Sequence, residues 1–342
     1  MILFGITKYK IIILSTFFVL SISFFVSSLF VHFYNNVLVR DYYYISSLWL
    51  GFLLNLLTLI IILTFILIIF KIFHINISLK IIGICLLSIA VIITGYGLYN
   101  ASNPIIKNVD ITIKNLPENW KHKKIIFLSD VHLGAILREN FLQKIVKMIN
   151  SEKPDIVFIS GDLLDGTDGS IDHLSNYINT IKAPIYYVNG NHETYIGMPE
   201  VEKILSKTKI KELKDEFVSV DGVQIVGISY TDERSGNSNL NSTFKKLEES
   251  GFKKDKPSIL LYHVPLYTEE FRIFGINLQL SGHSHKGQIW PYGYITNLIY
   301  GGKDYGLYTK DNYNLYTSNG VGTWGPPIRT GNTPEIVVLN LK

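Results

Sequence analysis

The sequence predicts about three membrane-spanning helices followed by a globular half of α/β or α+β class. Three long apolar runs in the first hundred residues indicate the helices, because crossing a bilayer needs roughly 20 apolar residues. Beyond them, short apolar runs alternate with amphipathic segments, a pattern typical of sheets covered by helices. The 342 residues leave room for two domains. We expect a transmembrane anchor over residues 1–105 and a globular domain over residues 106–342.

The three apolar runs cover residues 11–31, 45–70 and 81–99, and none of them contains a charged residue. A cleavable signal peptide is the alternative for the first run, but no small-x-small cleavage site follows it cleanly. Proton and ion pathways normally need ionisable groups inside the membrane. The runs therefore indicate an anchor, and the single cysteine, Cys85 in the third run, excludes an internal disulfide.

The charges divide unevenly between the two halves of the chain. Residues 1–105 hold five basic residues and one acid; subtracting these from the totals of 32 and 28 leaves 27 of each sign beyond. A globular half without net positive charge does not show the basic surface that is typical of nucleic-acid binding. Basic residues flank the spans on one side at Lys8, Lys10, Lys71 and Lys80, and on the other at Arg40, Lys107 and Lys114. This excess favours an internal N-terminus and an external globular domain.

Strand and helix signals alternate through the globular half. We predict strands at Lys124–Leu128, Ile156–Ile159, Ile185–Val188, Val223–Ile228, Ile259–Tyr262, Leu278–Leu280 and Glu335–Leu341. Apolar residues at helical spacing predict helices at Phe141–Ile149, Leu174–Ile181 and Val201–Leu205. In folds of this kind, ligands gather at the carboxyl ends of the strands.

Short polar fragments follow five of these apolar runs. They are Asp130-Val131-His132, Gly161-Asp162, Gly190-Asn191-His192-Glu193, His263 and Gly282-His283-Ser284-His285. Singly, each reads as a turn or helix-cap residue. Together they provide oxygen and imidazole donors for two metal ions, and paired ions about 3.5–4 Å apart can hydrolyse a phosphate ester. The candidate ligands are Asp130, His132, Asp162, Asn191, His263, His283 and His285.

The ordered pattern D-x-H, G-D, G-N-H-E, H and G-H-x-H resembles the calcineurin-like metallophosphoesterase superfamily. The resemblance runs from Asp130 to His285. It implies a four-layer sandwich of two mixed sheets flanked by helices. It also implies that a hydroxide bridging two divalent or trivalent ions attacks the phosphorus, with Mn, Fe, Zn and Ni all suitable.

The resemblance also implies a role for each residue. Asp130, His132 and His285 would bind the first metal ion, Asn191, His263 and His283 the second, and Asp162 both. His192 would not bind metal but would act as the catalytic proton donor to the leaving oxygen. Glu193 would accept a hydrogen bond from a metal-binding imidazole.

Within the superfamily, the chain resembles bacterial membrane-anchored members. The turn His263-Val264-Pro265 and the stretch Gly282–Ile289 carry this likeness, although members commonly have glycine where Lys286 stands. Hydrolases of the lipid A pathway usually carry Arg at the position of His192. The implied function is a membrane-anchored enzyme that acts on a phosphodiester or pyrophosphate, and its anchor favours a substrate of the membrane or cell envelope. The alternative is a non-catalytic metal-binding scaffold or sensor.

Several further residues invite weaker interpretations. Asp165 and Asp168 are interpreted as solvated loop residues. Trp290, Tyr292 and Trp324 either line a substrate groove or cap the domain as exposed aromatics. Arg329, the only arginine after Arg272, is a candidate for bidentate binding of a substrate phosphate.

Overall fold

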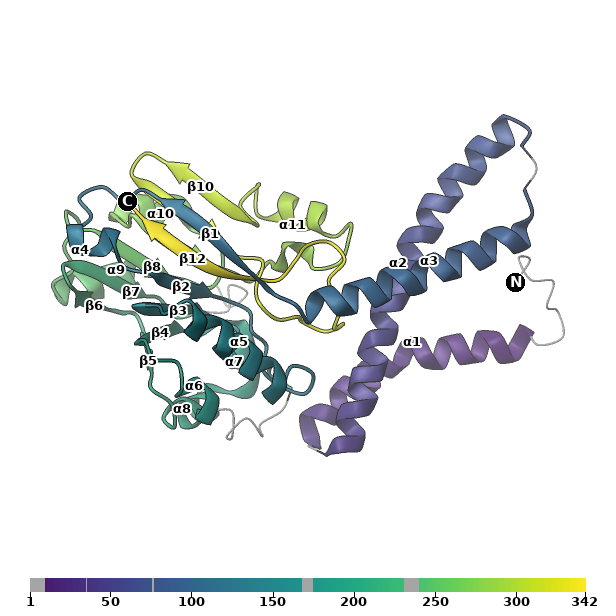
Figure 1. Cartoon of the computed structure of the whole chain (residues 1–342), viewed down its shortest axis with the longest axis horizontal. Coiled ribbons are helices and arrows are strands. Elements are labelled where there is room, and N and C mark those ends of the chain that lie inside the picture. The colour runs from purple at the N-terminus through teal and green to yellow at the C-terminus, as the bar shows by residue number, and fades with distance from the viewer. Residues whose placement is uncertain (1–9, 35, 76, 168–174, 231–239) are drawn as a thin grey trace.

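A computed structural model describes residues 10–34, 36–75, 77–167, 175–230 and 240–342. The apolar runs form three helices, α1 (Lys10–Phe33), α2 (Val37–Ile72) and α3 (Leu79–Ala101), which extend to one side of the globular part (Figure 1). All three are long and apolar enough to cross a membrane, as the sequence predicts. Helix α2 begins before the apolar run because the Asn36 side chain accepts a hydrogen bond from Val39 N and caps it.

The globular part contains two mixed sheets of six strands each. The first has the order β1 (Ile105–Ile111), β12 (Glu335–Leu341), β2 (Ile125–Leu128), β3 (Ile156–Ser160), β4 (Ile185–Val188) and β5 (Ile210–Glu212). Only the pairing of β12 with β2 is antiparallel. The predicted closing strand β12 thus lies between β1 and β2, elements from the opposite end of the domain.

The second sheet has the order β10 (Gly306–Lys310), β11 (Tyr313–Thr317), β9 (Leu278–Ser281), β8 (Ser258–Leu261), β7 (Val223–Gly227) and β6 (Glu216–Val220). Its inner pairs are parallel and its two edge pairs are antiparallel. The sequence analysis missed β1, β5, β6, β10 and β11. The edge strands β5, β6 and β10 are only partly buried, so they lack the continuous apolar run of the central strands.

Side chains alternate across β2 between two cores. Ile125 and Phe127 enter the cluster between the two sheets, whereas Ile126 and Leu128 enter the cluster beneath helix α5 (Glu139–Ser151). Helices α6 (Ser175–Ile178) and α8 (Met198–Leu205) share that outer layer, and α9 (Leu240–Glu249) and α10 (Thr268–Phe274) cover the second sheet. The predicted four-layer sandwich is therefore confirmed. Shorter helices are α4 (Glu118–Lys121), α7 (Asn191–Ile196), α11 (Gly293–Ile299) and the 3-10 turn η3 (His285–Gly287).

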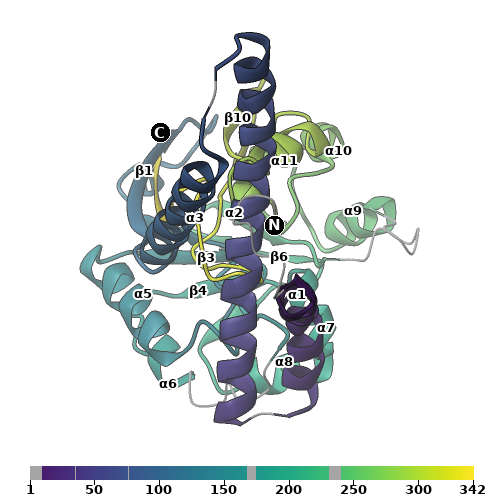
Figure 2. The same cartoon turned by 90° about the vertical axis from the view of Figure 1, so that its right-hand side faces the viewer.

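The apolar helices contact the globular part through α2, α3 and the segment 326–332, and Figure 2 shows the three helices in front of the sheets. The Asn100 side chain near the end of α3 donates to the carbonyls of Arg329 and Asn332 at 2.9 and 2.8 Å. Gly51 on α2 lets Ile328 approach so closely that a Cβ there would lie 2.6 Å from Ile328 Cδ1. Helices α2 and α3 are thus in direct contact with the segment 326–332.

Candidate metal centre

The seven candidate ligands come from loops that follow five strands, β2, β3, β4, β8 and β9, drawn from both sheets. Six of them are buried, and His283 is half-buried. Because the parallel strands of the two sheets end at the same edge of the sandwich, side chains far apart in sequence meet there. The structure brings together Asp130, His132, Asp162, Asn191, His263, His283 and His285.

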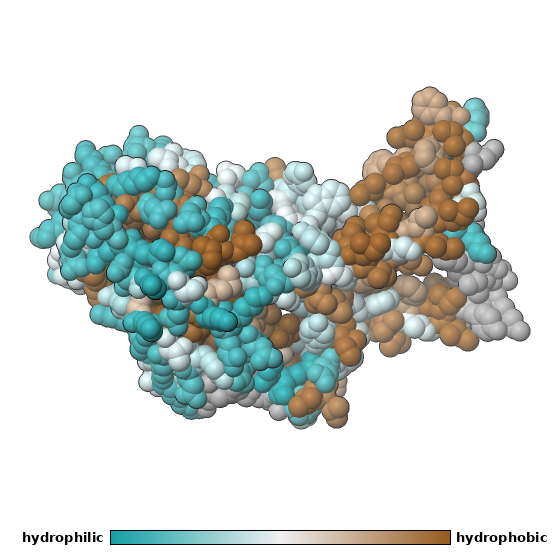
Figure 3. Space-filling view, viewed as in Figure 1, coloured by the Kyte–Doolittle hydropathy of each residue, from teal (hydrophilic) through white to brown (hydrophobic). Residues whose placement is uncertain are grey.

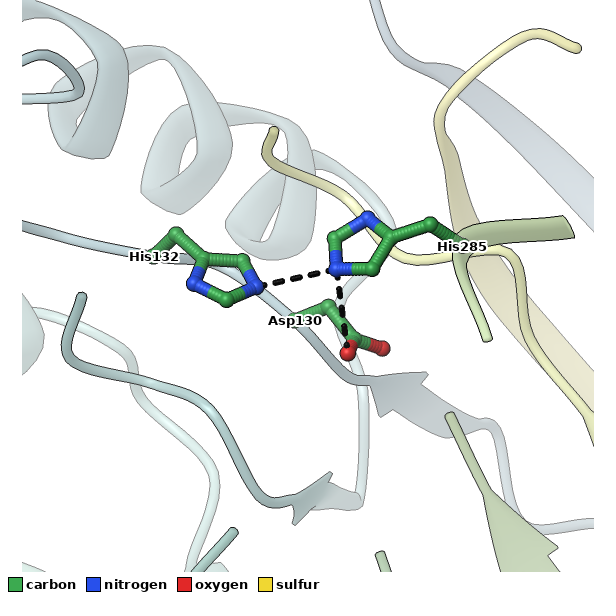
Figure 4. A group of neighbouring side chains, drawn as sticks. All are labelled: Asp130, His132 and His285. Carbon is green, nitrogen blue, oxygen red and sulfur yellow. Dashed lines mark hydrogen bonds and ion pairs between the residues drawn. The ribbon is translucent and has the colours of Figure 1, made fainter. Parts of the chain in front are cut away.

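Asp130, His132 and His285 form the first group of donors (Figure 4). His132 Nε2 and His285 Nε2 lie 3.0 Å apart, and His285 Nε2 lies 3.4 Å from Asp130 Oδ1. Two imidazole nitrogens at this distance repel unless a proton or a cation lies between them. The donor set therefore fits a metal ion that prefers nitrogen and oxygen ligands.

Asp162, His263 and His283 form the second group, and Asn191 contacts it. Asn191 Oδ1 lies 3.2 Å from His263 Nε2 and 2.9 Å from His283 Nδ1. His263 holds its outer nitrogen, Nδ1, 2.8 Å from the carbonyl of Ser160. When Nδ1–H donates to that carbonyl, Nε2 keeps its lone pair for the centre, the usual arrangement of a metal-binding imidazole.

Asp162 lies between the two groups. Its Oδ2 atom is 3.1 Å from His263 Nε2 and 3.9 Å from His132 Nε2. The other carboxylate oxygen, Oδ1, accepts a hydrogen bond of 2.9 Å from the backbone N–H of His192. One oxygen is thus fixed by the backbone while the other faces both groups, the position that a bridging carboxylate needs.

The Glu193 carboxylate accepts hydrogen bonds from the backbone of two loops and not from an imidazole. This buried carboxylate accepts backbone N–H groups from Gly190 at 2.6 Å, Leu164 at 2.9 Å and Asp162 at 3.1 Å. The expectation that Glu193 orients a metal-binding imidazole was therefore wrong. The carboxylate satisfies backbone donors of two loops that would otherwise be buried without partners.

The backbone of the centre is unusual at the candidate ligands. Five of them, Asp130, His132, Asp162, His283 and His285, have φ between 48° and 70°. Non-glycine residues rarely adopt this left-handed conformation, and when they do it is often at a functional site. At Gly190, an added Cβ would lie 2.2 Å from Asp162 Oδ1. The glycine is required there because the loop passes directly over the carboxylate.

Burial and neighbouring charges together shift the pKa values of the buried groups in the centre, and they oppose each other at Asp162 and His263. Burial opposes ionisation of Asp162, yet His263 and other nearby imidazoles hold the pKa of that carboxyl well below its usual range. Burial would lower the pKa of His263, but the Asp162 carboxylate outweighs it and raises the pKa to about 9. Burial and the charge of Asp162 raise the pKa of Glu193 to about 7. The buried negative charge of Asp162 thus draws positive charge, which metal cations would also supply.

His192 lies beside both donor groups but belongs to neither of the two predicted ligand sets. Its Nδ1 atom is 2.6 Å from the carbonyl of Asp165, and it can share a three-donor group with His132 and Asp162. The ring of Trp324 lies edge-on to it, with the centroids 6.2 Å apart. His192 therefore faces the centre from the side on which the exposed Trp324 stands.

Two interpretations of outlying residues were wrong. Asp165 is buried rather than solvated, and its carboxylate lies 3.4 Å from His132 Nδ1. Arg329 is fully buried and donates to the carbonyls of Asn319 and Gly322, so it is not available to a substrate phosphate. Neither position carries a local sequence signal that reveals its partner. Asp168 lies outside the described residues.

The sequence left two interpretations for Trp290, Tyr292 and Trp324: a substrate groove or exposed aromatics that cap the domain. Trp324 and Tyr292 line a pocket that also contains the ligand candidates His283 and His285. Trp290 is exposed and borders a different hollow. Trp324 and Tyr292 therefore lie beside the candidate metal centre, whereas Trp290 is not among the residues that line that pocket.

A two-sheet sandwich with paired Asp and His donors at its strand ends is typical of metal-dependent hydrolases, and the family match identifies the class as phosphoester hydrolases. Residues 123–287 match the family described as calcineurin-like phosphoesterase. An uncharacterised metallophosphoesterase of Aquifex aeolicus is 31% identical over 261 residues, covering 74% of this chain and 98% of that protein. The chain belongs to the calcineurin-like phosphoesterase family.

Other relatives are longer than this chain. An uncharacterised metallophosphoesterase of Campylobacter jejuni is 36% identical over 246 residues, which cover 70% of this chain and 63% of that protein. A transmembrane protein with metallophosphoesterase domain of Danio rerio is 30% identical over 274 residues, covering 75% and 62%. The chain therefore spans less than two thirds of the length of these two relatives.

Solved structures are less similar to this chain than these relatives are. A Thermus thermophilus protein has a TM-score of 0.41 and 14% identity, covering 58% of this chain and 90% of that one. A dimetal phosphatase from Danio rerio has a TM-score of 0.39 and 13% identity, covering 58% and 88%. Both TM-scores are too low to assign a function.

Proposed function

We propose that this chain is a membrane-anchored dimetal phosphoesterase that hydrolyses phosphodiester or pyrophosphate bonds. Residues 1–105 would form the anchor and residues 106–342 the catalytic domain. The observation that carries the proposal is the place of Asp162, whose Oδ2 faces two separate donor groups at 3.1 and 3.9 Å. A carboxylate in that place suits a pair of metal ions better than a single one.

The proposed ligand sets follow the two donor groups. Asp130, His132 and His285 would hold one ion, Asn191, His263 and His283 the other, and Asp162 both. When bound, the ions would lower the pKa of a water molecule and neutralise charge on the phosphate. The mixture of carboxylate, amide and imidazole donors suits Mn, Fe, Zn and Ni, and the choice among them stays open.

His192 is proposed as the catalytic proton donor. The carbonyl of Asp165, 2.6 Å from Nδ1, fixes the ring so that Nε2 is the nitrogen left for the substrate. A protonated ring would pass its Nε2 proton to the leaving oxygen of the ester. A positioned donor of this kind typically contributes about 10²–10⁴-fold to the rate.

The test compares Asp162→Asn with Asp311→Asn in the full-length protein supplied with Mn²⁺. Asp311 is an exposed acid between β10 and β11, far from the strand ends that carry the centre. We expect wild type to bind about two metal ions and to hydrolyse bis-p-nitrophenyl phosphate. Asp162→Asn should lose metal and at least about a hundredfold in kcat/KM, the scale of removing a group that stabilises the transition state.

Equal turnover by Asp162→Asn and wild type would refute the proposal. A wild-type protein that binds two ions but hydrolyses no phosphomonoester, phosphodiester or pyrophosphate would instead support the alternative, a metal-binding scaffold. Metal content and turnover are therefore measured on the same samples.

The proposed location is the cell membrane, with the catalytic domain outside. The three apolar helices and the transmembrane relative from Danio rerio support the anchor, and the distribution of Lys and Arg supports the orientation. The lipid bilayer and a phosphoester are the proposed partners, and nucleic acid is not. Protease added to intact cells should cleave the globular part; cleavage only after permeabilisation would reverse the orientation.

A further inference from the structure

A pocket of about 370 Å³ opens directly beside the candidate metal centre. At one end it is bounded by His283 and His285, one from each donor group. The rest of its wall is mainly apolar and includes Leu54, Ile289, Tyr292, Trp324 and Pro326. A phosphate held at the centre would therefore place one of its substituents in apolar surroundings rather than in water.

One wall of this pocket belongs to the proposed anchor. Leu54 lies in the middle of α2, and from there to its end the helix exposes apolar side chains, among them Leu57, Ile61 and Phe65. Figure 3 shows this apolar surface continuing over the helices beyond the globular part. The pocket is therefore continuous with the surface that a bilayer would cover.

Helix α11 also borders the pocket. Thr296 of α11 lines it, and four other side chains of this short helix form an exposed apolar face. That face consists of Tyr294, Ile295, Leu298 and Ile299, each more than half exposed. In Figure 1, α11 lies at the end of the globular part that is directed toward the membrane helices. An apolar face in that position is typical of a segment resting in the bilayer surface.

We infer that the substrate is a lipid phosphoester whose hydrocarbon chain lies in this pocket while its phosphate lies at the metal centre. The inference rests on the proposed function and names its substrate class. A water-soluble phosphoester would leave the apolar wall exposed beside the centre. A lipid enters from the bilayer between α2 and α11 without its chain crossing water, and burial of that chain supplies binding energy.

The test uses two diesters with the same leaving group, methyl and hexadecyl p-nitrophenyl phosphate. Full-length protein in mixed micelles with Mn²⁺ should show a kcat/KM at least about tenfold higher for the hexadecyl ester, the gain from burying only two methylene groups. Leu54→Trp fills the pocket and should reduce this ratio about tenfold. Leu57→Trp, the same change three residues along α2 and outside the pocket, should leave the ratio unchanged.

A second measurement does not depend on turnover. Metal-free protein is titrated with 12-bromododecyl phosphate, whose bromine quenches tryptophan fluorescence on contact. We expect saturable quenching that is largely lost in Trp324→Phe. Quenching that is equal in wild type and Trp324→Phe would overturn the inference.

The outcomes separate the two proposals. If wild type hydrolyses neither diester, the proposed function fails, and the quenching titration alone decides whether the pocket binds a hydrocarbon chain. If wild type hydrolyses both diesters equally and Leu54→Trp leaves the ratio unchanged, the lipid inference fails while the phosphoesterase function stands.

Discussion

At the residue scale, the candidate ligands hold one another in place through backbone amides. The N–H of His192 donates to Asp162, and the N–H of His283 donates to Asp130 at 3.0 and 3.1 Å. Each carboxylate is thus fixed by the loop that carries a different candidate residue. Hydrogen bonds to a carboxylate stabilise its charged form, which is the form that binds metal.

Gly190→Ala adds only one methyl group, but we expect it to displace the Asp162 carboxylate. The new methyl group would lie 2.2 Å from Asp162 Oδ1, where neither the buried carboxylate nor the loop has room to move. We expect a destabilisation of about 1–3 kcal/mol together with loss of bound metal. Thermal unfolding and metal analysis measure the two effects.

Gly95→Ala provides the control for this substitution. Gly95 lies within α3, and an added Cβ there meets no atom within 4 Å. Metal content equal to wild type in both variants would show that Gly190 does not shape the centre.

At the scale of elements, the centre is assembled from strand ends, whereas the apolar pocket beside it is lined by Leu54 of α2, Thr296 of α11 and the irregular segments near Gln288 and Trp324. The segment from η3 to α11 and the segment 323–330 meet through Gln288, which donates to the carbonyls of Trp324 and Pro326 at 3.1 and 2.9 Å. Trp324 N donates back to Gln288 Oε1 at 3.0 Å. These bonds hold the backbone of Trp324 against Gln288, and both residues line the pocket.

Leu298→Asp tests whether α11 contacts the bilayer. Leu298 is 82% exposed, so the change should alter the folding free energy by less than about 0.5 kcal/mol. A carboxylate in the bilayer surface is unfavourable, and we expect at least about a threefold lower rate on hexadecyl p-nitrophenyl phosphate in vesicles. The rate on the methyl ester in solution should not change.

Ile273→Asp is the matched comparison, because Ile273 is 70% exposed on α10 over the second sheet. An equal loss of vesicle activity in both variants would argue against a membrane contact at α11.

At the scale of the whole molecule, the segment 326–332 joins the apolar helices α2 and α3 to the candidate metal centre. Arg329 is buried beneath His285, with Nη2 3.2 Å from His285 Nδ1, and burial lowers its pKa to about 10. The backbone of Arg329 is bonded to helix α3: Arg329 N donates to Gly97 O, and Arg329 O accepts from the Asn100 side chain. Asn332 makes a second link, because its carbonyl accepts from Asn100 and its side chain donates to the carbonyl of His285. The position of α3 is therefore linked to a candidate metal ligand through Arg329 and Asn332.

Asn100→Ala tests this link. Removing the side-chain amide of Asn100 leaves the carbonyls of Arg329 and Asn332 without this donor in a buried junction. We expect destabilisation by about 1–3 kcal/mol, measured by thermal unfolding in detergent. Ser102→Ala, an exposed position at the end of the same helix, should change stability by less than about 0.5 kcal/mol. Equal melting of the two variants would show that the Asn100 contacts do not couple the two parts.

Much of this molecule could be predicted because its signals are local. Central strands such as β2 and β3 are buried on both faces, so they read as continuous apolar runs. The polar fragments after them carry donor types that suit metals. Edge strands such as β10 and partners such as Asp165 could not be predicted, because their environment depends on residues far away in the sequence.

The amino-acid sequence by itself determined that apolar helices precede a sandwich and that Asp, His and Asn side chains follow its strands, because both properties depend on short stretches of chain. Only the tertiary structure decided that Asp162 faces two donor groups and that Glu193 and Arg329 serve the backbone. It also decided that Leu54 of the apolar helix α2 lines the same pocket as His285, 231 positions further along the chain. The packing of the two sheets against each other, and of α2 and α3 against the segment 326–332, brings these distant segments together.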